Sequence, residues 1–165
     1  MENYFDLFEI PIQLRIDLGS VRPKFFALSR KFHPDFFVNR PPEEQQVALE
    51  KTAWLNRAWK TFQQPDELIR YVLEIHGCWV PGEKYELSPD FLMEVMEINE
   101  AMMEGEDGVS ASLQATVTAL QEQMTKPIQQ YLTECPFQPT PEKLADLKEF
   151  YYRKKYLDRI VQGLS

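Results

Sequence analysis

A histidine and an aspartate stand two residues apart in the tripeptide His33-Pro34-Asp35. Residues of these types can transfer protons, activate a nucleophile or make charged contacts with a partner. A catalytic arrangement would need a hydroxyl within reach, but Ser29 lies a full helical turn earlier, and no glycine-rich oxyanion or phosphate loop accompanies the tripeptide. Because the proline holds both side chains in a rigid turn, we interpret the tripeptide as a recognition loop and expect no enzymatic activity.

Cations gather on the segment that leads into this tripeptide. They flank an apolar stripe on both sides and consist of Arg22, Lys24, Arg30 and Lys31. A charged run is ordinarily a solvated helix face, and a histidine or aspartate in a turn ordinarily closes it or caps a backbone N–H. In a chain with a formal net charge of -8, positive charge beside an exposed loop instead favours a steered contact with an acidic partner surface.

The spacing of apolar residues around the tripeptide predicts two helices joined by a turn. The first is expected from Ser20 to Phe32, with Ser20 as N-cap and Pro23 in the first turn, where a missing N–H loses no partner. The second is expected from Glu43 to Phe62, and a shorter helix from Leu68 to Ile75. The apolar positions are Leu18, Val21, Phe25, Leu28 and Phe32, then Ala48, Leu55, Ala58, Trp59 and Phe62.

The second half of the chain predicts three further helices. Ser88-Pro89-Asp90 places an N-cap before a proline at the first helical position, and this helix is expected to stop near residues 105–108. The next helix is expected to run through Tyr131 with a kink at Pro127. Thr140-Pro141-Glu142 caps the last one. The inward positions are Phe91, Val95, Ile98 and Met102, then Leu113, Val117, Leu120, Met124 and Ile128, then Leu144, Leu147, Tyr151, Leu157 and Val161.

These patterns predict an all-α chain with two domains. The N-terminal hairpin domain is expected over residues 1–76, a breaker-rich linker over residues 77–88, and a C-terminal three-helix bundle over residues 89–165. A chain of 165 residues can bury roughly two thirds of its unfolded surface, so no metal or disulfide is needed to hold it together.

The composition excludes several classes of function. Cys78 and Cys135 have no CxxC spacing, which argues against a disulfide framework, a zinc site and any metal cofactor. The net negative charge argues against nucleic-acid binding. Neither a leader sequence nor an apolar stretch of about eighteen residues is present, so we expect a cytoplasmic protein without membrane contact.

On the helix that begins at Pro89, several residues are left over once the inward stripe is removed. They form a mixed apolar and acidic strip, which we call the client strip, of Leu92, Met93, Met96, Glu97, Glu100 and Glu104. Periodicity leaves two interpretations open. The apolar residues pack on a neighbouring element while the glutamates are solvated, or the strip binds a partner, with apolar contacts supplying affinity and charges supplying orientation.

The first half of the chain resembles the J domain. The resemblance runs through Tyr4-Phe5-Asp6-Leu7-Phe8, Phe25, the segment from Leu28 to Asp35 and the segment from Leu55 to Phe62. It implies a co-chaperone that stimulates the ATPase of a DnaK-class chaperone. The tripeptide His33, Pro34 and Asp35, together with the cations before it, would contact that chaperone.

The chain as a whole is similar to the HscB family of iron–sulfur cluster co-chaperones, because Pro65, Tyr71-Val72-Leu73, His76-Gly77 and Phe91-Leu92-Met93-Glu94 follow the J domain. This resemblance implies that the bundle binds the scaffold protein IscU and that the J domain presents it to an HscA-type chaperone. The scaffold contacts would be the client strip and Tyr156, whose alternative role is that of a half-exposed structural tyrosine. A general J-domain co-chaperone with another client remains the alternative function.

Overall fold

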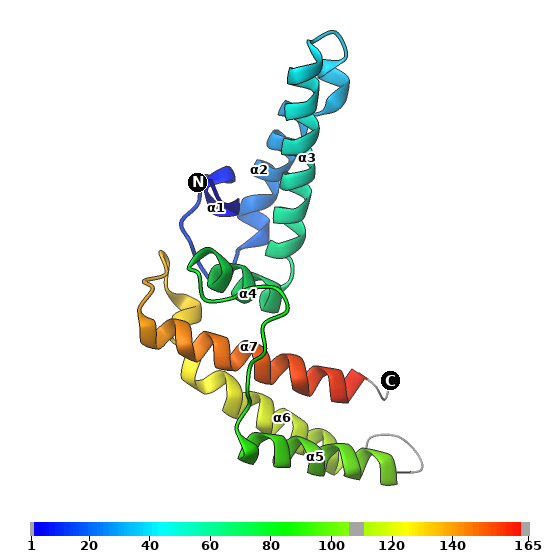
Figure 1. The fold of residues 1–165 in the computed structure, drawn as a ribbon, viewed down its shortest axis with the longest axis vertical. Coiled ribbons are helices and arrows are strands. Elements are labelled where there is room, and N and C mark those ends of the chain that lie inside the picture. Colours follow the sequence, from blue (N-terminus) through cyan, green and yellow to red (C-terminus); the bar gives the residue numbers. More distant parts are fainter. Residues whose placement is uncertain (1, 106–110, 163–165) are drawn as a thin grey trace. The chain divides into compact units, whose positions relative to one another are not determined.

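The computed structural model describes residues 2–105 and 111–162, which contain helices and no strand (Figure 1). The chain divides into two compact units. The first holds the chain up to Ile75 together with Leu132–Gln138, and the second holds His76–Tyr131 and the chain from Pro139 onward. The elements are α1 Tyr4–Leu7, α2 Leu18–Lys31, η1 Pro34–Phe37, α3 Pro42–Phe62, α4 Pro65–Ile75, α5 Pro89–Glu104, α6 Ala111–Thr125, η2 Lys126–Ile128, η3 Tyr131–Thr133 and α7 Pro141–Gln162. The predicted all-α fold is confirmed.

In the first unit, α2 and α3 form the predicted hairpin, and α1 and α4 lie near its base, away from the connecting turn (Figure 1). Aromatic rings fill this base. The Phe62 ring lies 5.5 Å from that of Phe5 and 5.0 Å from that of Phe8, centroid to centroid. Tyr71 stacks on Tyr4 at 4.1 Å and accepts a hydrogen bond of 2.9 Å from the Tyr4 backbone N–H. Burial of rings and aliphatic side chains therefore fixes the hairpin at one end.

The start of α2 differs from the sequence prediction. The helix begins at Leu18, and its N-cap is Asp17, whose carboxylate accepts a 3.1 Å hydrogen bond from the Gly19 N–H. The Ser20 hydroxyl instead donates to the Asp17 carbonyl. Pro23 consequently lies inside the helix rather than in its first turn, and the Gly19 carbonyl, on an exposed residue, loses an intrahelical donor. The Asp17 carboxylate, rather than the Ser20 hydroxyl, is therefore the N-cap of α2.

In the second unit, α5, α6 and α7 pack against one another as a three-helix bundle. Ser88 caps α5, as predicted, by accepting a 3.3 Å hydrogen bond from the Phe91 N–H. The inward stripe of α5 is also confirmed, since Phe91, Val95, Ile98 and Met102 are buried. On α7, Leu144 and Val161 are only half-buried, and Phe150 takes a core position that the stripe had missed.

After Thr125 the structure departs from the predicted kinked helix. The α-helix ends there, and two short 3-10 turns, η2 and η3, replace its continuation around Pro127. The segment Leu132–Gln138, which we expected in the C-terminal domain, belongs to the first unit. Its Phe137 is buried, and the Phe137 N–H donates a 2.7 Å hydrogen bond to the Ile12 carbonyl. The expected stop of α5 lies partly outside the described residues, and α5 ends at Glu104.

The reassigned cap of α2 yields a test. Asp17→Ala should lower the free energy of unfolding by about 1 kcal/mol, because the Gly19 N–H loses its acceptor. Ser20→Ala should cost less than about 0.5 kcal/mol, because it removes only an exposed bond to a carbonyl. Urea unfolding of both variants measures the difference, and a larger loss in Ser20→Ala would contradict the assignment.

Candidate functional site

The tripeptide forms a capped turn at the end of the hairpin. His33 is the N-cap of η1, and its Nδ1 accepts a 3.2 Å hydrogen bond from the Asp35 backbone N–H. The imidazole, not the Asp35 carboxylate, therefore caps this turn. In the imidazole tautomer that accepts this bond, the ring N–H is on Nε2. The His33 side chain is 53% exposed and that of Asp35 is 85% exposed, which leaves both groups available to a partner.

Side chains of α3 hold the two ends of this turn, and the sequence patterns had not singled them out. Thr52 donates a 2.9 Å hydrogen bond to the carbonyl of Phe32, the residue before His33. Gln45 donates to the carbonyls of Val38 at 3.3 Å and Arg40 at 2.8 Å. The backbone on both sides of the tripeptide is thus tied to one rigid helix, which positions the exposed groups for recognition.

The cations before the turn are all exposed, but they differ in their contacts. Arg22, Arg30 and Lys31 lie on α2, and the Lys31 ammonium is 5.3 Å from the centroid of the Phe32 ring. The Lys24 ammonium donates to the carbonyls of Phe8 at 3.2 Å and Glu9 at 3.4 Å. Lys24 therefore also fastens α2 to the end of α1. The structure places all four on the helix that leads into His33.

An exposed aromatic ring beside His33 had not been predicted as a site residue. Phe36 is 70% exposed, and its ring meets the imidazole edge-on at 6.2 Å between centroids. Large exposed rings are uncommon on a free surface and typical of binding sites. A pattern search for inward stripes cannot find such a residue, because it lies in a turn without periodicity.

On α5 of the second unit, the client strip is open to solvent. Met93 is 60% exposed and Met96 is 56% exposed, Glu97, Glu100 and Glu104 are exposed, and Leu92 is half-buried. Tyr156 of α7 is half-buried, and its ring lies edge-on to that of Phe91 at 6.4 Å. The Phe91 contact brings Tyr156 beside the first turn of α5, one residue from Leu92. Met103, also exposed, was not among the predicted residues.

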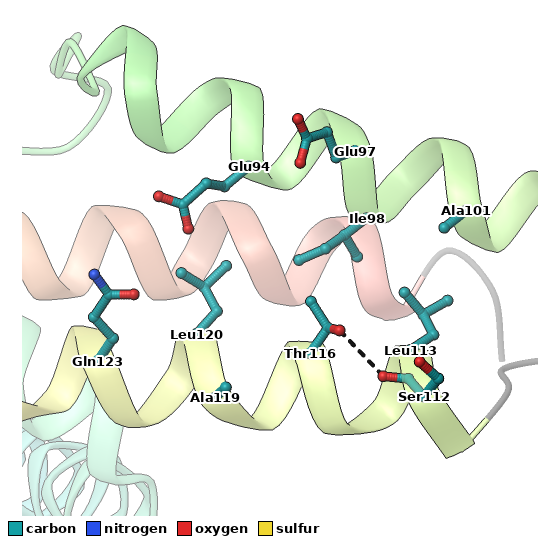
Figure 2. Close-up of a pocket in the computed structure, with 10 residues that line it drawn as sticks. All are labelled: Glu94, Glu97, Ile98, Ala101, Ser112, Leu113, Thr116, Ala119, Leu120 and Gln123. Atoms are coloured by element: carbon teal, nitrogen blue, oxygen red, sulfur yellow. Dashed lines mark hydrogen bonds between the residues drawn. The ribbon is translucent and has the colours of Figure 1, made fainter.

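A groove of about 450 Å³ runs between α5 and α6 beside the client strip (Figure 2). Ile98, Leu113 and Leu120 point into the space between the two helices, and the carboxylates of Glu94 and Glu97 stand at its α5 edge (Figure 2). Glu97 is the residue that the groove shares with the client strip. The client strip therefore borders an apolar depression with an acidic rim. Residues of α6 line one side of this depression, and the periodicity of α5 could not indicate them.

A polar network ties the segment after α4 to α7. The Glu83 carboxylate accepts a 2.6 Å hydrogen bond from the Tyr152 hydroxyl and a 3.1 Å contact from the Lys148 ammonium. These two donors, the hydroxyl first, lower the pKa of the Glu83 carboxyl against the opposing effect of burial. Burial, and then the bond to Glu149, raises the pKa of Tyr85 to about 12, so its hydroxyl remains a donor.

The described residues contain no metal-binding cluster and no helix that could span a membrane. Within residues 2–105 and 111–162, no three histidine, cysteine or acidic side chains cluster as a metal site would require. None of the described helices combines the length and apolar content that a bilayer crossing demands. Cys78 and Cys135 are both free thiols.

Comparison with known proteins gives concordant matches. A family model described as the HSCB C-terminal oligomerisation domain matches residues 87–165. The human iron-sulfur cluster co-chaperone protein HscB is 29% identical over 150 residues, which are 90% of this chain and 64% of the human protein. The co-chaperone protein HscB homolog of Vibrio cholerae strain O395 is 28% identical over 168 residues, with 98% of each chain covered.

Solved structures agree with the sequence matches. The crystal structure of human co-chaperone protein HscB superposes with a TM-score of 0.77 at 27% identity, covering 99% of this chain and 80% of that one. The structure of the chaperone HscB from Vibrio cholerae gives a TM-score of 0.64 at 27% identity, covering 98% and 94%. Both units of this chain therefore have counterparts in these proteins.

A helical hairpin that presents an exposed His-Pro-Asp turn, followed by a three-helix bundle, defines a J-domain protein with an appended helical domain. Within this class the chain is similar to the HscB co-chaperones.

The Glu83 network generates a pH-dependent prediction. Because the pKa of Glu83 is lowered by folding, its contribution to stability is complete above the ordinary glutamate pKa and disappears as the pH falls through the lowered value. Glu83→Gln should therefore be less stable than the native chain at neutral pH and lose less stability on acidification. Urea unfolding at neutral and acidic pH measures this. Glu86→Gln, an exposed neighbour, is the matched control, and an equal effect in both variants would contradict the prediction.

Proposed function

We propose that this protein is a co-chaperone of iron–sulfur cluster maturation that couples a DnaK-class chaperone of the HscA type to the scaffold protein IscU. The observation that carries the proposal is the exposed His33-Pro34-Asp35 turn, which Thr52 and Gln45 hold at both ends in a chain similar to the HscB co-chaperones. The human relative is named an iron-sulfur cluster co-chaperone, which supports the same role.

The first unit acts as an allosteric effector and catalyses no reaction itself. His33 and Asp35 present an Nε2–H donor and a carboxylate on a turn that Thr52 and Gln45 hold in place, so little conformational entropy is lost on docking. Exposed cations on α2 steer the unit to an acidic surface of the chaperone ATPase. These cations are Arg22, Lys24, Arg30 and Lys31. Stimulation follows if this contact binds the hydrolysis-competent conformation more tightly than the other.

The second unit binds the client, IscU. Exposed Met93 and Met96 supply adaptable apolar contact area, and the acidic residues of the client strip orient a basic partner surface. Delivering the client on the same chain as the chaperone-binding turn raises its local concentration at the chaperone without an active site. The free thiols of Cys78 and Cys135 fit a reducing cytoplasm, where we place the protein.

The turn is tested by His33→Gln in an ATPase assay of the cognate chaperone with this protein and the scaffold. A hydrogen bond to a charged group contributes about 1.5–3 kcal/mol, so the variant should bind roughly tenfold to a hundredfold more weakly and stimulate correspondingly less. His76→Gln is the matched control, because His76 is the other histidine of the chain and lies in the second unit. Equal stimulation by native protein and His33→Gln would overturn the proposed mechanism.

The client strip is tested by Glu100→Lys in a titration of the scaffold by calorimetry. Reversing a charge that faces a basic partner should weaken binding about tenfold. Glu122→Lys makes the same charge change at an exposed position of α6 outside the strip and the groove, and should leave binding nearly unchanged. If the two variants bind alike, the client contacts this unit elsewhere or a different client is bound.

A further inference from the structure

A second depression lies in the C-terminal unit, and Tyr156 is among the residues that line it. It has a volume of about 280 Å³ and is formed where the segment after α4 crosses the second half of α7. Aromatic rings make its walls and two cations stand among them. The residues on which its chemistry depends are Trp79, Tyr85, Tyr152, Tyr156, Lys155 and Arg159. We call it the aromatic pocket.

The walls of the aromatic pocket are held in place before any ligand arrives. Tyr85 stacks on Tyr152 at 4.6 Å with an interplanar angle of 8°. The Tyr152 hydroxyl donates to Glu83 and receives a hydrogen bond from the Trp79 side chain, while the Tyr85 hydroxyl donates to Glu149. Because these hydroxyls are already engaged, the rings offer a ligand apolar faces rather than new hydrogen bonds. A preformed apolar wall is typical of a binding pocket.

The charge of the aromatic pocket is positive. Its carboxylate, Glu83, is paired with Lys148 at 3.1 Å. Lys155 donates to the Tyr151 hydroxyl at 3.2 Å, and among residues 2–105 and 111–162 neither Lys155 nor Arg159 forms an ion pair with a carboxylate. Arg159 lies in the last turn of α7, where its charge also complements the helix dipole. That role does not account for the position of Lys155 or for the aromatic walls around both cations. A ligand that carries negative charge fits this site.

The size of the aromatic pocket selects the kind of ligand. Drug-sized ligands occupy clefts of about 300–1,000 Å³, and a volume of about 280 Å³ lies at the lower end of this range. A single apolar side chain of a protein partner fits better, and such anchors dominate the energy of many interfaces. The edge-on contact of Tyr156 with Phe91 makes the pocket continuous with the first turn of α5. One partner bound to the client strip can therefore reach it.

We propose that the aromatic pocket receives an apolar side chain with a neighbouring carboxylate from the same client that binds α5. The inference rests on the client-binding function proposed above. The side chain lies against the rings of Trp79 and Tyr156, and the carboxylate pairs with Lys155 and Arg159. The interface then has an acidic part on α5 and a basic part on α7. Because the two parts attract opposite charges on the client, the client binds in one orientation.

Arg159→Glu tests the pocket in calorimetric titrations of the full chain with its cognate scaffold protein. The variant should bind about tenfold more weakly, because an attractive charge becomes repulsive. Arg159→Gln, which only removes the charge, should show a smaller loss. Lys126→Glu is the matched control, since it reverses an exposed cation of the same unit outside the pocket. Circular dichroism verifies that the variants fold.

An NMR titration gives an independent readout, because the chain has three tryptophans. Adding scaffold should shift the indole N–H signal of Trp79, whereas Trp54 and Trp59, in the first unit, should stay unchanged. If Glu100→Lys weakens binding while Arg159→Glu and the Trp79 signal respond like the controls, the pocket proposal is wrong and the client-binding function stands. If neither charge reversal weakens binding, the client-binding function and the pocket proposal fail together.

Discussion

Burial at the base of the α2–α3 hairpin is the constraint on which the first unit depends. A hairpin of two helices has too little mutual contact to hold an exposed turn in one geometry, and isolated short helices are marginal in water. Phe5, Phe8 and Phe62 provide the missing contact, each less than 4% exposed at the junction with α1 and α4. With the base fixed, the far end of the hairpin can remain polar and open. The residues that stabilise the hairpin therefore lie away from the exposed turn.

The two units carry their charges differently, and this difference organises the proposed function. In the first unit, cations on α2 stand beside the exposed turn, while in the second an acidic α5 lies beside a basic half of α7. The net charge of -8 does not reveal this pattern, because it sums the charges of all faces. In the proposed function, charge sets partner choice and orientation, and exposed Met93, Met96 and Phe36 offer the apolar area for affinity.

The departures from the sequence predictions share a physical cause, which is competition among local signals. Asp17 and Ser20 can both cap a helix, and the side chain that reaches Gly19 decided where α2 begins. Around Pro127, a kink and a break are both compatible with the missing hydrogen bond. The helix breaks here, and the next segment leaves the bundle for the first unit. There the Phe137 N–H donates a hydrogen bond to the Ile12 carbonyl.

The sequence by itself determined the helix class, the hairpin, the inward stripe of α5 and the turn at His33, because each depends on residues within a few positions of one another. Only the tertiary structure decided that Thr52 anchors that turn, that α6 forms one wall of the groove, and that Trp79 and Tyr156 line one pocket. These contacts join residues far apart in the chain, and long-range packing leaves no periodic trace from which they could be predicted.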